Sequence, residues 1–185
     1  MSVVAVVLAA GSGSRFAGPT HKLRARHEGR SIVERAIEAA VDSGIGPVMV
    51  VTGAEPLGDL IPPSVTEIRA SHWSAGQSHS LAAAIGVVTD TRADAVVVGL
   101  GDMPGVTPQC WASVALSAAP IAVARYDGHR APPVKLSRDM WSELPSSGDR
   151  GARDLMHRRP ELVVEVAVEG DARDVDTLED LDSLT

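Results

Sequence analysis

The feature that most constrains the fold is a short apolar run near the start of the chain that ends in a glycine- and serine-rich loop. Residues 3–9 are all Val, Ala or Leu, and Ala10-Gly11-Ser12-Gly13-Ser14 follows them directly. A continuous apolar run of this length is typical of a strand buried on both faces of a sheet. In such sheets ligands bind beyond the carboxyl ends of the strands. The loop is therefore the first candidate for a binding site.

Apolar runs of strand length alternate with segments of helical period along the rest of the chain. Further strands are predicted at 48–52, 65–70, 95–100, 121–125, 134–136 and 162–168, and helices between Ser31 and Gly44, at 78–88, 108–118 and 150–158, and after Thr177. The alternation predicts a mostly parallel sheet covered on both sides, and Asp127-Gly128 predicts a hairpin turn that adds one antiparallel strand. We therefore expect a single α/β domain over residues 1–185, folded as a three-layer sandwich.

The composition limits the class of protein and its compartment. Hydrophobic residues make up 44% of the 185 residues, which excludes an intrinsically disordered chain. The formal net charge of −7 argues against a general nucleic-acid binder, because such a protein needs a basic face. Cys110 is the single cysteine, and no apolar run approaches the roughly 20 residues of a membrane span. We therefore expect a cytoplasmic protein that binds neither nucleic acid nor membrane.

The charge is distributed unevenly along the chain. Residues 15–30 carry a net charge of +4, whereas residues 171–185 carry −5. The first segment is suited to face a polyanion and the second to face a metal ion. Most of the acidic residues from Glu179 to Asp182 fit a solvated helix face, but Asp176 precedes that helix and follows a strand. Asp176 is therefore a candidate metal ligand.

The loop after the first strand nearly matches two well-known phosphate-binding motifs and fails both. A dinucleotide fingerprint from Gly11 needs a third glycine where Phe16 stands, and a P-loop from Gly13 needs Lys-Ser/Thr where Pro19-Thr20 stands. Its glycines still allow backbone N–H groups to turn towards an anion, and Arg15 and Lys22 add full positive charges. The alternative is a flexible connection without a ligand.

A second carboxylate follows the buried strand at 95–100. Asp102 stands between Gly101 and Met103-Pro104, so a rigid segment holds it at the edge where ligands bind. Mg²⁺ typically takes one or two carboxylates together with substrate phosphates and water. The simpler alternative for Asp102 is a turn or capping residue.

Other candidate nucleophiles and metal ligands have simpler explanations. Cys110 lies beside Trp111 and is more typical of packing than of a reactive thiol. Ser78, His79 and Ser80 lack the Gly-x-Ser-x-Gly elbow of a hydrolase. The six histidines lack the spacing of zinc ligands.

Several motifs in one order resemble those of a known family. They are Leu8-Ala9-Ala10-Gly11 with Arg15 and Lys22, Trp73-Ser74-Ala75-Gly76-Gln77-Ser78-His79-Ser80-Leu81 (similar to Trp-x-x-Gly-Met-Ser-x-Ser-Leu), Gly101-Asp102-Met103-Pro104, Gly148-Asp149-Arg150-Gly151-Ala152-Arg153, and Asp174-Val175-Asp176-Thr177. The chain resembles the molybdenum cofactor nucleotidyltransferases, which are MobA-like NTP transferases, from about Val4 to Leu181. Within them it is most similar to the molybdopterin cytidylyltransferases.

The resemblance implies a fold, a reaction and a set of site residues. The fold is a mixed, Rossmann-like sheet of the nucleotide-diphospho-sugar transferase type, and the reaction moves CMP or GMP from a nucleoside triphosphate to the terminal phosphate of molybdopterin or a related acceptor, with Mg²⁺ as cofactor. The resemblance implies that Lys22, Arg15 and Asp102 are catalytic and that Asp102 and Asp176 bind the metal. It implies that the acceptor is bound by Asp149, Arg150 and Arg153. The implied nucleotide-binding residues are Leu8, Ala9, Ala10, Gly11, Ser12, Gly13, Ser14, Lys22, Gly76, Ser78 and Ser80. A molybdoenzyme is implied as a transient partner.

The resemblance leaves open which nucleotide and which acceptor are used, and functions other than a transferase are also possible interpretations of the sequence. Ala10 matches the form of the first motif that goes with CTP, whereas the guanylyltransferases usually have Gly there. Residues 130–134 replace the family's Gly-His-Pro, so the acceptor is molybdopterin or a related phosphorylated compound. The alternatives to a transferase are an NAD(P)-dependent oxidoreductase of a catabolic pathway, since relatives carry that label, and a non-catalytic cofactor carrier.

Overall fold

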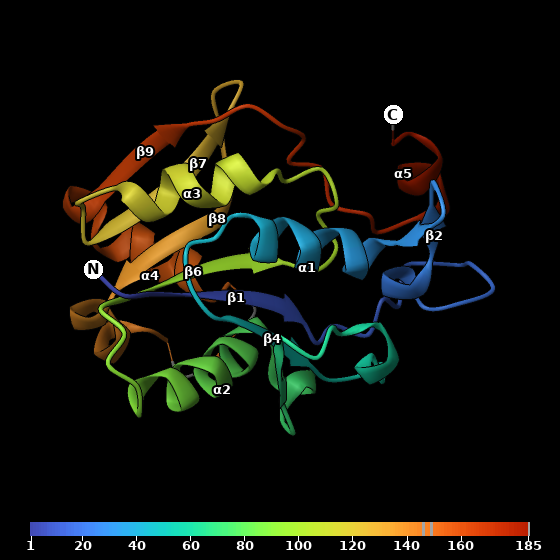
Figure 1. Ribbon diagram of the computed structural model, residues 1–185, viewed down its shortest axis with the longest axis horizontal. Coiled ribbons are helices and arrows are strands. Elements are labelled where there is room, and N and C mark those ends of the chain that lie inside the picture. Colours follow the sequence, from blue (N-terminus) through green and yellow to red (C-terminus); the bar gives the residue numbers. More distant parts are fainter. Residues whose placement is uncertain (146, 149, 185) are drawn as a thin grey trace.

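The computed structural model describes residues 1–145, 147–148 and 150–184, and has a seven-stranded mixed sheet between two layers of helices (Figure 1). The sheet has the order β5-β4-β1-β6-β8-β7-β9. Its strands are β1 (Val3–Ala9), β4 (Val48–Thr52), β5 (Thr66–Arg69), β6 (Ala95–Leu100), β7 (Ile121–Tyr126), β8 (His129–Ser137) and β9 (Val163–Ala167), and a separate hairpin holds β2 (Arg26–His27) and β3 (Arg30–Ser31). The helices are α1 (Ile32–Asp42), α2 (Gln77–Thr89), α3 (Pro108–Leu116), α4 (Ala152–Arg158) and α5 (Leu178–Asp182).

Alternate residues of the buried strands build two cores on opposite faces of the sheet. The alternation is clearest in β1, where Val7 packs in the core with α1 and α3, and Val6 packs in the core with α2 and α4. Both side chains are fully buried, which explains why β1 is an uninterrupted apolar run. A third, smaller core joins Phe16 and Ile32 to Val175, so the end of the chain lies beside the start of α1 (Figure 1).

The predicted hairpin reverses a single strand among those described in the large sheet. β8 pairs antiparallel with both β6 and β7, while the other pairs are parallel. At the turn, Asp127 has a φ of +43° and Gly128 a φ of +88°. Positive φ at both central residues is the signature of a two-residue hairpin with the twist of the flanking strands. The expected mixed sheet is thus confirmed.

The predicted helix starts are also present. The Ser31 hydroxyl accepts a hydrogen bond from the Glu34 amide, and the Glu34 carboxylate accepts one from the Ser31 amide, which completes a capping box on α1. Thr177 and Asp180 form the same arrangement on α5. The main differences are that β8 extends over residues 129–137 rather than 134–136, and that the β2–β3 hairpin was not predicted. None of the helices in the described ranges is long and apolar enough to cross a membrane.

Candidate active site

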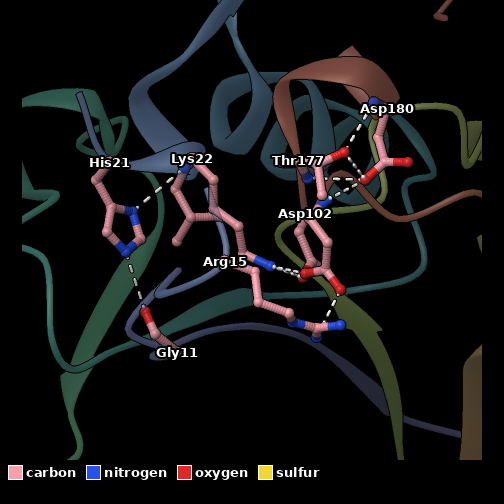
Figure 2. Close-up of polar contacts among 9 residues, drawn as sticks. Gly11, Arg15, His21, Lys22, Asp102, Thr177 and Asp180 are labelled. Carbon is pink, nitrogen blue, oxygen red and sulfur yellow. Dashed lines mark hydrogen bonds and ion pairs between the residues drawn. The ribbon is translucent and has the colours of Figure 1, made fainter. Parts of the chain in front are cut away.

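Three segments that are distant in the sequence meet at the carboxyl ends of β1 and β6. Lys22 lies in a 3-10 turn after the first loop, Asp102 follows β6, and Asp176 precedes α5. The Lys22 Nζ donates to Asp102 Oδ2 at 2.7 Å and to Asp176 Oδ1 at 2.7 Å. The Arg15 guanidinium reaches Asp176 Oδ2 at 2.6 Å. Figure 2 shows this group, in which the ammonium of Lys22 is shared by two carboxylates.

Asp102 occupies its position because the chain leaves β6 in close contact with β1. The Gly101 amide donates to the Leu8 carbonyl at 2.8 Å, and a Cβ on Gly101 would lie 3.0 Å from the Cβ of Ala9. The Asp102 carbonyl accepts from the Val175 amide at 2.8 Å, which ties the two acidic segments together. Burial raises the pKa of Asp102 above its usual range, although the charge of Lys22 opposes the rise.

Lys22 keeps its proton in this environment. Burial alone would lower the pKa of Lys22, but the attraction of Asp102 and Asp176 and their hydrogen bonds outweigh it, so the pKa is raised. The side chain of Lys22 is 9% exposed. The site therefore holds a fully charged ammonium within reach of an incoming anion.

Asp180 holds Asp176 in place, a role that sequence reasoning missed. The Asp180 carboxylate accepts from the Asp176 amide at 3.0 Å, from the Thr177 amide at 2.7 Å and from the Thr177 hydroxyl at 2.8 Å (Figure 2). The Thr177 hydroxyl, followed by the two amides, holds the pKa of Asp180 below its usual range. The capping spacing of Thr177 and Asp180 was the available signal, but it pointed to a helix cap rather than to a support for the site.

His21 braces the glycine loop, and it too was missed. Its Nδ1 accepts from the Leu23 amide at 3.3 Å, so the proton is on Nε2, which lies 3.2 Å from the Gly11 carbonyl (Figure 2). Gly13 has a φ of +60°, and a Cβ there would lie 2.9 Å from His21 Nε2. A side chain at this position would therefore have to shift His21 and adopt a strained backbone conformation. The position of His21 directly before Lys22 was its only sequence signal.

The positive segment at residues 15–30 is more neutralised than its net charge indicates. Arg24 contacts Glu55 at 2.6 Å and Asp59 at 2.6 Å, and Arg30 is paired with Glu38. Among its cations, Arg15 and Lys22 are the ones that reach the two carboxylates of the site. The two segments contact one another through these ion pairs, and the expectation that the first faces a polyanion and the second a metal ion stays a prediction.

A small cavity of about 290 Å³ opens beside Asp102. The glycine loop and the start of α2 form its walls; lining residues include Leu8, Ala10, Gly11, Ser12, Gly76 and Ser80, all of them predicted nucleotide-binding residues. The other predicted nucleotide-binding residues, Ala9, Gly13, Ser14, Lys22 and Ser78, lie outside that lining. Ser78 is 1% exposed, and its amide donates to the Gly148 carbonyl at 3.0 Å. We call this space the small cavity.

A larger cavity of about 420 Å³ lies on the same side of the sheet, over β6, β7 and β8, and we call it the large cavity. Its floor is apolar, with Val98, Val123 and Met156 among the lining residues. Its positive residues are Arg130, Arg150, Arg153 and, when protonated, His157. The structure thus brings the predicted acceptor residues Arg150 and Arg153 together, while Asp149 lies outside the described residues. Arg130 and His157 were not predicted.

The residues present fit a divalent metal ion. Asp102 and Asp176 each place one carboxylate oxygen 2.7 Å from the cationic Nζ of Lys22, so both face a position that already accommodates positive charge. Carboxylate oxygens are the hard ligands that Mg²⁺ and Mn²⁺ prefer. Within the described part of the chain no three His, Cys, Asp or Glu residues gather as a metal site. An ion held by two carboxylates needs its other ligands from a substrate or water.

Cys110 is part of the packing. It is 1% exposed, beside the buried Trp111, and its Sγ donates to the Glu169 carbonyl at 2.9 Å. This environment agrees with the packing interpretation of the sequence.

Comparisons with known proteins agree with this geometry. The chain is 30% identical over 195 residues to nicotine blue oxidoreductase of Paenarthrobacter nicotinovorans, covering 97% of this chain and 94% of that protein. Rv0371c of Mycobacterium tuberculosis H37Rv is 27% identical, with a TM-score of 0.83 over 97% of this chain and 95% of that one. Another structure of Rv0371c, a complex with manganese, has a TM-score of 0.80 at 27% identity over 100% of both chains.

A nucleotidyl transferase from Methanothermobacter thermautotrophicus has the same fold, with a TM-score of 0.78 at 20% identity over 97% of this chain and 94% of that one. These likenesses confirm the predicted Rossmann-like fold of the nucleotide-diphospho-sugar transferase type. The profile of the MobA-like NTP transferase domain matches residues 5–163. This match spans most of the chain, and the protein therefore belongs to the MobA-like NTP transferase family of nucleotidyltransferases.

Proposed function

We propose that this protein transfers CMP, or less favourably GMP, from a nucleoside triphosphate to the terminal phosphate of molybdopterin or a related phosphorylated acceptor, and releases pyrophosphate. The observation that carries the proposal is the convergence of Lys22, Asp102 and Asp176 beside the small cavity. We further propose that residues 1–185 work as one transferase unit in the cytoplasm.

The nucleotide donor occupies the small cavity. Loop amides from Gly11 to Ser14 face the triphosphate, and Arg15 and Lys22 contribute the full positive charges. The start of α2, with Gly76 and Ser80, borders the base and ribose. Ala10 favours CTP because the resemblance associates this form of the first motif with cytidylyl transfer.

Asp102 and Asp176 would hold Mg²⁺, which would neutralise negative charge on the triphosphate. Lys22 would exchange its two carboxylate partners for phosphate oxygens of the nucleotide. Its hydrogen bonds of 2.7 Å to both carboxylates support this proposal, because the ammonium has only a short distance to move. Asp180 and Thr177 keep the Asp176 backbone in place during this exchange.

The acceptor occupies the large cavity, where Arg150 and Arg153 hold it. Asp149 is proposed as a third acceptor-binding residue on the resemblance alone. An oxygen of its phosphate attacks the α-phosphorus, the bond from that phosphorus to the bridging oxygen breaks, and pyrophosphate leaves with the electron pair. A phosphate monoester has a second pKa of about 6 and is already an anion near neutral pH, so no general base is required. The chain's task is to position two anions and offset their charge. A molybdoenzyme would receive the product through a transient contact.

The direct test measures pyrophosphate release from Mg²⁺ and CTP, with GTP in parallel, when molybdopterin is added. We expect release that depends on both the metal and the acceptor. Asp102→Ala should abolish turnover while circular dichroism shows an intact fold. Turnover near the wild-type rate in that variant would contradict the assignment of Asp102.

A second candidate is an NAD(P)-dependent oxidoreductase, which the similarity to nicotine blue oxidoreductase favours. Against it, the glycine loop does not lead into a helix, because α1 begins only at Ile32. A dinucleotide site of the usual kind places the pyrophosphate on a helix N-terminus directly after the glycines. Titration with NADPH and NADH, with CTP and Mg²⁺ in parallel, separates the two functions, and pyrophosphate release excludes a non-catalytic carrier.

A further inference from the structure

The small and large cavities meet at three shared lining residues, Leu8, Gln77 and Leu100. Two of them are leucines, so Gln77 is the one shared lining residue in the described chain with a polar side chain. A ligand in one cavity and a ligand in the other therefore approach each other beside a single carboxamide.

The backbone places the Gln77 side chain at this junction. Gln77 is the first residue of α2, after Gly76, whose φ is +113°. Across the junction, Gly151 has a φ of +48°, and a Cβ on it would lie 3.2 Å from Gln77 Oε1. The side chain thus lies against the segment that leads into α4. No hydrogen bond joins the Gln77 carboxamide to another residue in the described ranges, although it is half-buried.

We propose that Gln77 is a positioning residue that contacts the ligands of both cavities at once and couples their binding. The inference rests on the proposed function, in which a nucleoside triphosphate fills the small cavity and an anionic acceptor fills the large one. A carboxamide has two N–H donors and one carbonyl acceptor, and it carries no charge. It can therefore hydrogen-bond to oxygens of two anions and set their relative position, which is what an in-line transfer requires.

Charge at the junction explains why an amide suits this position. Asp102 lines the small cavity, and Arg150 and Arg153 line the large one, so each cavity already has a strong charge. A carboxylate between two anions would repel both, whereas an apolar side chain would leave their facing oxygens without a donor. The similar family motif has Met where this chain has Gln77, which makes Gln77→Met a variant of similar volume that the family's fold accepts.

The experiment measures binding of CTP with Mg²⁺ and of 6-carboxypterin, alone and together. 6-Carboxypterin is a suitable probe because the apolar floor accepts its flat ring and its carboxylate supplies anionic oxygens for both the arginines and Gln77. Calorimetry gives the affinity of the wild type for CTP with and without saturating 6-carboxypterin, and the ratio is the coupling factor. Gln77→Met, Gln77→Glu and the exposed control Gln109→Met are measured in the same way.

In Gln77→Met we expect each ligand alone to bind within about twofold of the wild type, because water replaces the carboxamide while the other cavity is empty. The coupling factor should fall by about 5–10-fold, the value of one hydrogen bond that water cannot replace once both ligands are bound. Gln77→Glu should lower the coupling factor further, and Gln109→Met should leave the coupling factor unchanged. Four results would overturn this inference and leave the proposed function standing: no binding of 6-carboxypterin by the wild type, a wild-type coupling factor near one, an unchanged coupling factor in Gln77→Met, or an equal loss with each ligand alone. Failure of the wild type to bind CTP would overturn the proposed function, and this inference with it.

Discussion

The small and large cavities differ in how their charges are balanced before a ligand binds. Beside the small cavity, Lys22 and Arg15 are ion-paired with Asp102 and Asp176 at distances of 2.6–2.7 Å. A ligand that uses these cations must first separate them from the carboxylates. Binding beside the small cavity therefore includes breaking ion pairs within the protein.

In the large cavity fewer of the positive side chains form ion pairs. Arg130 contacts Glu165 at 2.7 Å, whereas no ion pair joins Arg150 or Arg153 to a carboxylate of the described residues. An anion entering this cavity meets guanidinium groups without displacing a protein carboxylate. The comparison predicts that removing the shared cation beside the small cavity should change activity and stability together, whereas removing Arg150 or Arg153 from the large cavity should change acceptor affinity alone.

The largest effect is expected from Lys22→Met, which leaves Asp102 and Asp176 facing each other without their shared cation. Their side chains are 20% and 18% exposed. The loss should be about 2–4 kcal/mol in the free energy of unfolding at pH 8, somewhat below the value for a fully buried pair. We expect turnover to fall below detection, measured by pyrophosphate release, with stability measured by urea unfolding.

The stability loss in Lys22→Met should depend on pH. Without the ammonium, which opposes the effect of burial, the folded-state pKa of Asp102 rises further, so the variant loses stability as pH rises through about 4 and above. In the wild type the pKa of Lys22 is raised, so its contribution is complete below about 10.4 and is lost only above that pH. The difference between the two proteins should be small at pH 4 and large at pH 8. An equal difference at both values would contradict this account.

Asp102→Asn should separate activity from stability. It removes one metal ligand, so we expect a loss of activity of about 10³-fold or more, equivalent to about 4 kcal/mol of transition-state stabilisation. The midpoint of thermal unfolding should stay within a few degrees, because Lys22 keeps Asp176 and a buried carboxylate with a raised pKa is removed. Asp182→Asn, an exposed position in the same acidic segment, is the matched control and should retain activity. Equal losses in the two variants would refute a specific role for Asp102.

Arg153→Met tests the large cavity. Loss of a charge-assisted hydrogen bond of about 1.5–3 kcal/mol should raise the KM for the acceptor by about 10–150-fold. With saturating acceptor, the KM for CTP should remain near the wild-type value. The free energy of unfolding should do so as well, because Arg153 has no ion pair with another described residue. A parallel rise in the KM for CTP would show that the two cavities are not separate sites. Arg158→Met, on the same helix but outside the lining of the large cavity, is the control.

The fold was predictable from the sequence because its signals are local. Buried strands such as β1 and β6 read as uninterrupted apolar runs, and capping pairs such as Ser31 with Glu34 mark helix starts within four residues. The edge elements were less predictable: β8 begins with exposed polar residues, and the β2–β3 hairpin has only two residues in each strand. Such segments have too few alternating apolar positions to give a period.

The candidate site was predictable only in part, because many of its contacts join residues that are distant in the sequence. Lys22, Asp102 and Asp176 stand in recognisable loops at strand ends, so the motifs point to each of them separately. Their shared ion pairs join residues 80 and 154 positions apart, and no local pattern encodes that contact. The neutralisation of Arg24 by Glu55 and Asp59 was hidden in the same way, because it depends on how two loops pack.

Gly13→Ala is expected to have the smallest effect, and it tests whether the loop beside the small cavity is braced by His21. Gly13 has a φ of +60°, which costs an Ala residue about 1–2 kcal/mol, and its Cβ would lie 2.9 Å from His21 Nε2. Gly11→Ala is the matched control, because no atom lies within 4 Å of its Cβ and its φ is not positive. Urea unfolding should show a loss of about 1–2 kcal/mol for Gly13→Ala and less than about 0.5 kcal/mol for Gly11→Ala. Equal losses would mean that the loop adapts freely, and the contrast between a braced small cavity and an open large one would then rest on the ion pairs alone.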